Sequence, residues 1–369
     1  MNLWPSDNYW AHFGVFTVIV LVVVLMGVMA YIYVERRGFG PFQLRMGPNR
    51  AGFGGFRFWG ILQPVADAIK VLLKEDIVPT AADKVVHFLA PIVGFLPVLL
   101  IFAVVPFHNG YGLLPDLSVG VLYVVAISSL GVVGVFMAGW ASNNKYSLIG
   151  GIRVIAAMVS YEIPLVLSII GVVLISGSLS MNGIVEGHTI PFFLLTPLGF
   201  LIFMMSSMAE INRGPFDMLE ADSEIVAGFH IEYSGMKFAM FYLAEYGHAL
   251  AMSAIAATLF FRGWEGPGAE YIGWLWFAIK TVFIFILMIW LRVAYPRLRI
   301  DQLMSFAWKF LLPLALINLL IIGAEVYGFG IGNDIPWWML FVNFAAAGIL
   351  IVVFSRFYKV GGGRVEVEA

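Results

Sequence analysis

The sequence predicts an all-α polytopic integral membrane protein, and its composition and its apolar stretches carry that prediction. The 369 residues are 61% hydrophobic and only 12% charged, and the mean hydropathy is +0.92. A soluble domain of this length could not bury so much apolar surface. Apolar stretches long enough to cross a bilayer recur along the chain, and they leave no room for a large soluble domain. We therefore expect a single membrane domain over residues 1–369.

Nine apolar stretches are candidate membrane spans, because a helix needs about 20 apolar residues to cross the hydrocarbon core. The last is an extra C-terminal transmembrane helix at 336–356. Almost all Lys and Arg residues lie in the loops after spans 1, 3, 5 and 7, at the adjoining span ends or in the C-terminal tail. The exceptions are Arg262 and Lys280. The positive-inside rule places those loops and the C-terminus in the cytoplasm and the N-terminus outside. The nine stretches lie near residues 13–34, 85–107, 118–140, 154–177, 191–211, 240–261, 270–293, 308–327 and 336–356.

Several function classes are excluded by what the sequence lacks. There is no cysteine, so the chain holds no iron–sulfur cluster, cysteine zinc site or disulfide, and any redox centre must lie in a partner. The histidines show no metal-ligand spacing, and no phosphate-binding or dinucleotide motif occurs. We expect no metal and no nucleic-acid partner. The first basic residue is Arg36, so the first apolar stretch lacks the basic start of a signal peptide and is expected to remain as a span.

The first cytoplasmic loop, residues 36–84, contains an amphipathic segment. Glycines and prolines between residues 38 and 50 prevent a regular helix there. Across 62–75 the apolar positions fall on one helical face, with Gln63, Asp67 and the lysines on the other. This pattern predicts an amphipathic interfacial helix at 62–75. It either lies on the lipid headgroups or forms the lip of a cavity.

Acidic residues gather in the cytoplasmic loop at 212–239. After Pro215, a helix would place Asp217, Glu220 and Glu224 on one stripe, and Asp222 lies between them. Close carboxylates titrate as a coupled set with some pKa values raised, which suits a proton relay. A solvated acidic loop is the alternative interpretation.

Three neighbouring spans carry a carboxylate at or near their cytoplasmic ends: Glu162, Glu210 and Glu245. Charge in hydrocarbon costs roughly 2.5 to 3.5 kcal/mol on insertion scales, so such residues usually mark ion paths, proton relays or ligand sites. Beside the acidic loop they predict a proton path. Glu325, at the other end of span 8, is expected to be a boundary residue, and His248 is expected to be structural.

Six runs of the sequence carry a resemblance to a known family. They extend from Glu35 to Arg50, Leu62 to Asp76, Gly139 to Ser147, Ser160 to Pro164, Pro215 to Tyr233 and Pro296 to Met304. These runs resemble the H subunit of respiratory complex I, a family that includes the mitochondrial NADH dehydrogenase subunit 1. The similarity covers roughly residues 13–327, in order and with matching topology.

The resemblance implies a membrane-arm subunit of a proton-pumping NADH:quinone oxidoreductase, an enzyme in which this chain is not catalytic alone. It would form the membrane end of the quinone-binding tunnel and the start of a carboxylate path that couples quinone reduction to proton translocation. Spans 2–6 would form an antiporter-like half-channel. Quinone would be the substrate, and FMN and iron–sulfur clusters would lie in partner subunits, with no cofactor bound in this chain.

The resemblance also implies site residues, partners and a location. The quinone-binding residues would be Glu35, Arg36, Arg45, Asp67, Arg292 and Arg299. The proton path would be Glu162, Glu210, Asp217, Glu220, Asp222, Glu224, Glu232 and Glu245. The partners would be the B and D subunits of the peripheral arm and the A, J and K subunits of the membrane arm, in a bacterial inner membrane with the N-terminus periplasmic.

Two alternatives stay open at this point. Similar subunits occur in membrane-bound hydrogenases, in quinone reductases driven by ferredoxin or another donor, and in a photosynthetic complex, and the full loop from Glu35 to Asp76 favours a quinone-reactive member. A stand-alone cation/proton antiporter is the second alternative. Its function would not explain the long cytoplasmic loops.

Overall fold

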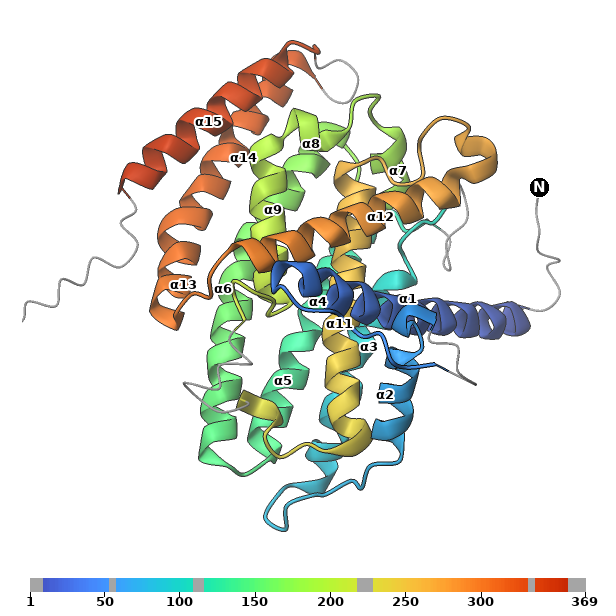
Figure 1. Cartoon of the computed structure of the whole chain (residues 1–369). Helices are drawn as coiled ribbons and strands as arrows, with labels where there is room; N and C mark the ends of the chain where they lie inside the picture. Colours follow the sequence, from blue (N-terminus) through green and yellow to red (C-terminus); the bar gives the residue numbers. More distant parts are fainter. Residues whose placement is uncertain (1–8, 53–57, 109–115, 218–227, 331–335, 358–369) are drawn as a thin grey trace, which may run out of the picture.

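We describe the fold from a computed structural model of the chain (Figure 1), which covers residues 9–52, 58–108, 116–217, 228–330 and 336–357. The secondary structure in these ranges is helical throughout, without a strand. Within them, seven helices are long and apolar enough to cross a membrane. The predicted all-α polytopic class is therefore confirmed, whereas the count of nine spans and the half-channel stay predictions.

The seven candidate spans include single helices and helices with short interruptions. The third span joins α4 and α5, and the sixth joins α13, a π-helical turn η3 and α14. In chain order the elements are α1 (Tyr9–Phe42), α3 (Lys84–Phe102), α4 (Gly120–Ser128), α5 (Leu130–Ala141), α6 (Lys145–Ser176), α12 (Ala269–Ala294), α13 (Ile300–Phe306), η3 (Ala307–Leu311), α14 (Leu312–Phe329) and α15 (Met339–Phe357).

Two further long elements lie among these spans, where the fifth and sixth spans were predicted. They are α9 (Pro197–Glu210) and α11 (Gly235–Phe260). The remaining helices are short: η1 (Phe58–Gly60), α2 (Gln63–Leu72), α7 (Met181–Glu186), α8 (Phe192–Leu195) and η2 (Gly228–His230). The helix α2 falls inside the segment predicted as amphipathic, residues 62–75.

The helix α6 begins earlier than the sequence suggests. Its first residue is Lys145 rather than one near 154, because the Asn144 side chain caps the helix by accepting a hydrogen bond from the Tyr146 amide at 3.0 Å. It ends at Gly177, whose φ of 66° is a left-handed conformation that glycine adopts without strain. As a consequence Glu162 lies in the middle of a 32-residue helix, not near its start as predicted.

The predicted span at 191–211 is broken into α8 and α9. The interruption lies at Thr196, and Pro197 begins the new helix. Proline suits the first position of a helix because it has no N–H to donate and its φ is already helical. The break leaves backbone carbonyl groups at the end of α8 available to side chains of other helices.

The core of the molecule is a bundle in which α3, α5, α6, α9 and α11 run side by side (Figure 1), with α1 and α12 crossing one face of it. Small residues allow close helix packing. A Cβ on Gly134 of α5 would come within 2.7 Å of the Gly94 backbone on α3. The helices α14 and α15 lie on the flank of the bundle, beside α6, α8 and α9.

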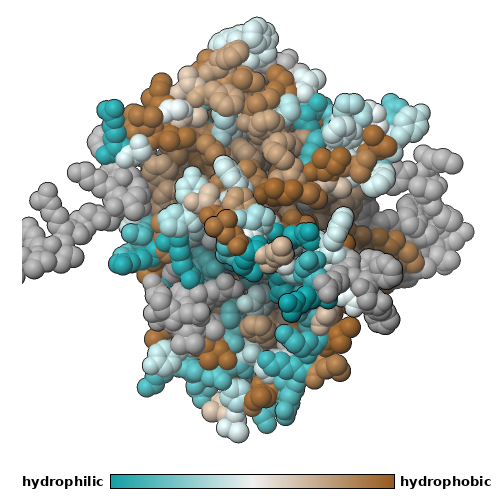
Figure 2. Space-filling view, viewed as in Figure 1, coloured by the Kyte–Doolittle hydropathy of each residue, from teal (hydrophilic) through white to brown (hydrophobic). Residues whose placement is uncertain are grey.

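The outer surface is apolar where the spans are exposed. Hydrophobic side chains cover most of the upper half of the face seen in Figure 2, and hydrophilic ones gather across its centre and lower half. Val18, Trp290 and Ile349 are 62%, 54% and 63% exposed. Apolar side chains exposed along several spans are typical of a surface that faces lipid.

Candidate functional site

A buried network of charged side chains joins α1, α11, α12 and the turn that follows α9. Glu35 on α1 is 3% exposed and Arg213 in the turn is 6% exposed. Arg213 Nη1 donates to Glu35 Oε1 at 3.0 Å, and its Nε lies 2.8 Å from Glu245 Oε1 on α11. Arg292 on α12 also pairs with Glu35. The network therefore balances the buried Glu35 and the partly buried Glu245 with two guanidinium groups, which offsets the cost of burying charge.

Local structure directs Arg213 into the interior. Asn212 adopts a left-handed φ of 57°, which turns the chain as α9 ends, and the Arg213 amide donates to the Met208 carbonyl at 3.0 Å. The guanidinium lies 3.9 Å from the centre of the Tyr246 ring. Burial alone lowers the pKa of Arg213, but Glu245 and Glu35 raise it well above its ordinary value. Arg213 is thus a permanent cation between two carboxylates.

The first residues of the acidic loop are tied to the same network. Asp217 lies 3.7 Å from Arg292 Nη2 and 3.5 Å from Arg297 Nη2, measured from its carboxylate oxygens. Arg297 Nε also donates to the Asp217 carbonyl at 2.5 Å. Glu220, Asp222 and Glu224 lie outside the described residues, so the predicted carboxylate stripe stays a prediction.

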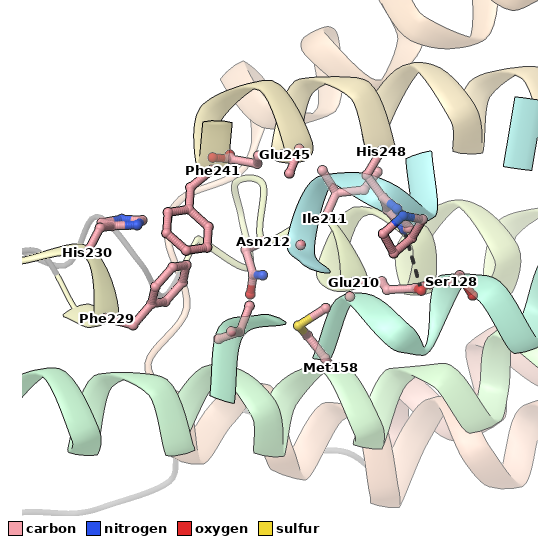
Figure 3. Close-up of a pocket in the computed structure, with 15 residues that line it drawn as sticks. Ser128, Met158, Glu210, Ile211, Asn212, Phe229, His230, Phe241, Glu245 and His248 are labelled. Atoms are coloured by element: carbon pink, nitrogen blue, oxygen red, sulfur yellow. Dashed lines mark ion pairs between the residues drawn. The ribbon is translucent and has the colours of Figure 1, made fainter. Parts of the chain in front are cut away.

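A cavity of about 70 Å³ lies inside the bundle, enclosed by residues of α3, α5, α6, α9 and α11. Its polar lining includes Glu210, Glu245 and His248 (Figure 3). Glu210 is 4% exposed, and its Oε1 lies 3.5 Å from His248 Nε2. The space is large enough for a few water molecules, which need roughly 10 to 15 Å³ each by this measure. Because Glu245 both lines the cavity and pairs with Arg213, the cavity adjoins the ion-pair network.

Two other predicted path residues lie outside this cavity. Glu162 is half-buried on α6, one turn from Met158, which does line the cavity. Glu232, at the end of the acidic loop, accepts a hydrogen bond from Asn144 Nδ2 at 2.7 Å. This contact joins the end of the loop to the cap of α6.

The predicted quinone-binding residues fall into separate places. Glu35 and Arg292 belong to the buried network, whereas Arg36 pairs with Asp67 at 2.5 Å and so ties α1 to α2. Arg45 is exposed and donates to Gln43 at 2.6 Å. The amide of Arg299 contacts the Gln302 side chain at the start of α13, at 3.2 Å. Four of the six residues thus form two ion pairs, and each pair has one member on α1.

Sequence reasoning missed the central position of Arg213 in the network and the contact of His248 with Glu210. Apart from the arginines that the resemblance implied for the quinone site, it treated basic residues as markers of topology. A useful signal was available, because buried carboxylates require compensating cations. Arg213, three residues after Glu210, was the basic residue to examine.

The described residues hold no group of three or more His, Asp or Glu side chains placed to bind a metal ion. The whole sequence lacks cysteine. The side chains at this site are instead carboxylates, guanidinium groups and imidazole, which bind and pass protons or compensate charge.

Comparison with known proteins identifies the family. A family model described as NADH dehydrogenase matches residues 15–323. The H subunit of the NADH-quinone oxidoreductase of Dehalococcoides mccartyi strain 195 is 56% identical over 362 residues, which cover 98% of this chain and 100% of the relative. The chain belongs to the family of NADH-quinone oxidoreductase H subunits.

Relatives in other bacteria have the same family name. The H subunit of Anoxybacillus flavithermus is 47% identical over 326 residues, covering 87% of this chain and 96% of the relative. That of Geobacillus kaustophilus is 48% identical over 330 residues, covering 87% and 97%. The predicted H-subunit family is therefore confirmed, and with its seven candidate spans this member is a multi-pass membrane protein.

Proposed function

We propose that this chain is a membrane-arm subunit of a proton-pumping NADH:quinone oxidoreductase. It forms the membrane end of the quinone-binding tunnel and the start of the proton path. The names of its relatives support the enzyme. One observation about this chain supports the coupling role: Glu245 belongs both to the ion-pair network of Glu35 and to the cavity of Glu210.

The quinone side of the proposal rests on the charges around α1. Reduction of a quinone consumes two protons and creates transient negative charge, which guanidinium groups such as those of Arg36, Arg45, Arg292 and Arg299 stabilise. Glu35 faces Arg292 and Arg213 at once. A negative charge arriving near Arg292 weakens its hold on Glu35, and this favours protonation of that carboxylate.

The proton-transfer part of the proposal follows from Arg213, which contacts both Glu35 and Glu245. Arg213 divides its charge between Glu35 and Glu245, so protonation of Glu35 leaves the arginine free to hold Glu245 more strongly. Interactions of this kind are strong in an environment of low effective dielectric. The cavity then offers water between Glu245 and the Glu210–His248 pair. The path would continue through Glu162 and Glu232 and through Asp217, Glu220, Asp222 and Glu224 of the acidic loop.

The proposal includes the surroundings of the chain. Its cytoplasmic loops would contact the B and D subunits of the peripheral arm, and its membrane surface would contact the A, J and K subunits. FMN and iron–sulfur clusters would lie in partner subunits. The location would be a bacterial inner membrane, with the N-terminus periplasmic and the C-terminus cytoplasmic, and α3 to α11 would form the antiporter-like half-channel.

The test uses the intact assembly, purified through a tag on this chain and reconstituted in liposomes. Glu245→Gln should lower NADH-driven proton uptake at least tenfold, because glutamine cannot bind and release a proton. Glu270→Gln, at an exposed position at the start of α12, is the matched control and should pump normally. Normal pumping by Glu245→Gln would contradict the path, and an assembly active only with reduced ferredoxin would contradict NADH as donor.

A further inference from the structure

A further buried carboxylate lies at the opposite end of the bundle and takes no part in the proposed path. Glu325, near the end of α14, is 7% exposed. The sequence predicts a boundary residue there, and the structure adds that α15 covers the side chain through Asn343. An ionisable residue buried within membrane spans is costly and usually has a function.

The contacts of Glu325 come from a neutral amide. Asn343 on α15 is 8% exposed, and its Nδ2 donates to Glu325 Oε2 at 3.2 Å and to the Leu195 carbonyl at 2.7 Å. Leu195 is the last residue of α8, where the helix breaks before Pro197. The other oxygen of the carboxylate, Oε1, is enclosed and has no hydrogen-bond partner among the described residues.

No opposite charge compensates Glu325 in the helices that surround it. Residues 163–176 of α6, 192–209 of α8 and α9, and 339–355 of α15 contain no Asp, Glu, Lys, Arg or His. On its own helix the nearest titratable group is Tyr327, which is 95% exposed. His188 precedes α8 and packs beside Phe192, with ring centres 5.8 Å apart. A carboxylate here would be charged in an apolar setting with one neutral donor, at a large energetic cost.

A small cavity lies beside the Asn343 amide. Its volume is about 10 Å³, enough for one water molecule, and its polar lining consists of Thr196, Asn318 and Asn343. Asn318 and Thr196 are 7% and 3% exposed. Polar side chains on three elements therefore meet at the α8–α9 break, and Asn343 links this cluster to the Glu325 carboxyl group.

We propose that Glu325, Asn343 and Asn318, together with the Leu195 carbonyl, form a proton-binding site at the outer end of the bundle. Glu325 holds the proton on Oε1, while Asn343 donates to Oε2. The site lies near the end of α14, and we expect this proton to exchange with the adjacent aqueous phase. Glu325 and α15 both follow the residues matched by the family model, which ends at residue 323.

Infrared difference spectroscopy on the intact purified assembly tests this site without NADH or quinone. The spectrum of the wild type minus that of Glu325→Gln should contain one carbonyl band of a protonated carboxyl group at pH 7. The band should shift in heavy water, because the proton exchanges. Asn343→Leu should retain the band at a higher frequency, since the hydrogen bond to Oε2 is lost. Tyr327→Phe, at an exposed position on the same helix, should leave the spectrum unchanged in the carboxyl region.

Several results would overturn the proposal. A missing carboxyl band at pH 7 would mean that Glu325 is ionised, and a band insensitive to heavy water would mean that it is sealed from solvent. Failure of Glu325→Gln to assemble would also contradict the proposal, because glutamine resembles the protonated acid in shape. A rise in the unfolding temperature with Na⁺ instead of choline, present in the wild type and lost in Glu325→Gln, would assign the site to a metal cation.

Discussion

The two ends of this helix bundle bury carboxylates in different ways. At the end that carries Arg213, Glu35 and Glu245 face the guanidinium groups of Arg213 and Arg292. At the opposite end, Glu325 meets only the amide of Asn343. Opposite charges compensate the first two carboxylates, whereas Glu325 has only a neutral partner. The comparison teaches that buried carboxylates of one chain can serve separate tasks according to their partners.

The largest expected effect concerns Arg213, the cation that Glu35 and Glu245 share. Arg213→Met removes the partner of both Glu35 and Glu245, and breaking a buried ion pair from one side costs roughly 3 to 5 kcal/mol. We expect a sharp fall in the unfolding temperature of the purified assembly, or loss of this chain from it. Adding Glu245→Gln to Arg213→Met should recover part of that loss. Wild-type stability of the single variant would mean that the network carries little energy.

A smaller effect is expected when one carboxylate of the same network is neutralised. Glu35→Gln keeps the shape but leaves Arg292 and Arg213 with weaker acceptors, and a hydrogen bond to a charged group is worth about 1.5 to 3 kcal/mol. Thermal unfolding measures the loss, and quinone reduction should slow in the same preparation. An unchanged unfolding temperature would indicate that Asp217 alone holds Arg292.

The end that carries Glu325 should respond more weakly, because its contacts are neutral. Asn343→Leu removes the hydrogen bonds to Glu325 and to the Leu195 carbonyl, and such bonds between membrane helices average about 0.6 kcal/mol, with about 1.7 as the observed maximum. We expect a modest decrease in unfolding temperature. A loss as large as that of Arg213→Met would contradict the contrast between the two ends.

The smallest effect on stability belongs to the partly exposed pair between α1 and α2. The Arg36 and Asp67 side chains are 48% and 29% exposed, and exposed ion pairs contribute roughly 0.2 to 1 kcal/mol. Arg36→Gln should therefore hardly change the unfolding temperature, while the KM for quinone should rise if Arg36 lines the tunnel. An unchanged KM would remove Arg36 from the quinone-binding set.

Sequence reasoning predicted the spans well where apolar residues are continuous, as in α3. It ended the first span near residue 34 and expected no regular helix from residue 38, but α1 continues to Phe42 with Pro41 inside it. It misplaced the start of α6 because a side-chain cap, not hydropathy, begins that helix at Asn144. It also missed the break at Thr196, where the apolar character continues although the helix does not. Periodicity and hydropathy report burial along one segment, and they carry no information about such local backbone changes.

The residues of the candidate site were also predicted only in part. The intramembrane cost of charge identified Glu210 and Glu245, and the structure places both in the lining of one cavity. Arg213 was missed because its importance depends on Glu35, which is 178 positions away in the sequence. The burial of Glu325 was missed because the side chain that covers it, Asn343, lies on α15. Hydropathy does not show which helices pack against each other.

The single arginine between Glu35 and Glu245 also constrains how the sequence can vary. A relative that replaces Arg213 with a neutral residue would be left with two uncompensated carboxylates, so at least one of them must change in the same lineage. The three positions are therefore expected to be inherited together, although they lie on two helices and a turn far apart in the chain. A survey of related sequences can detect this co-variation without any biochemical preparation.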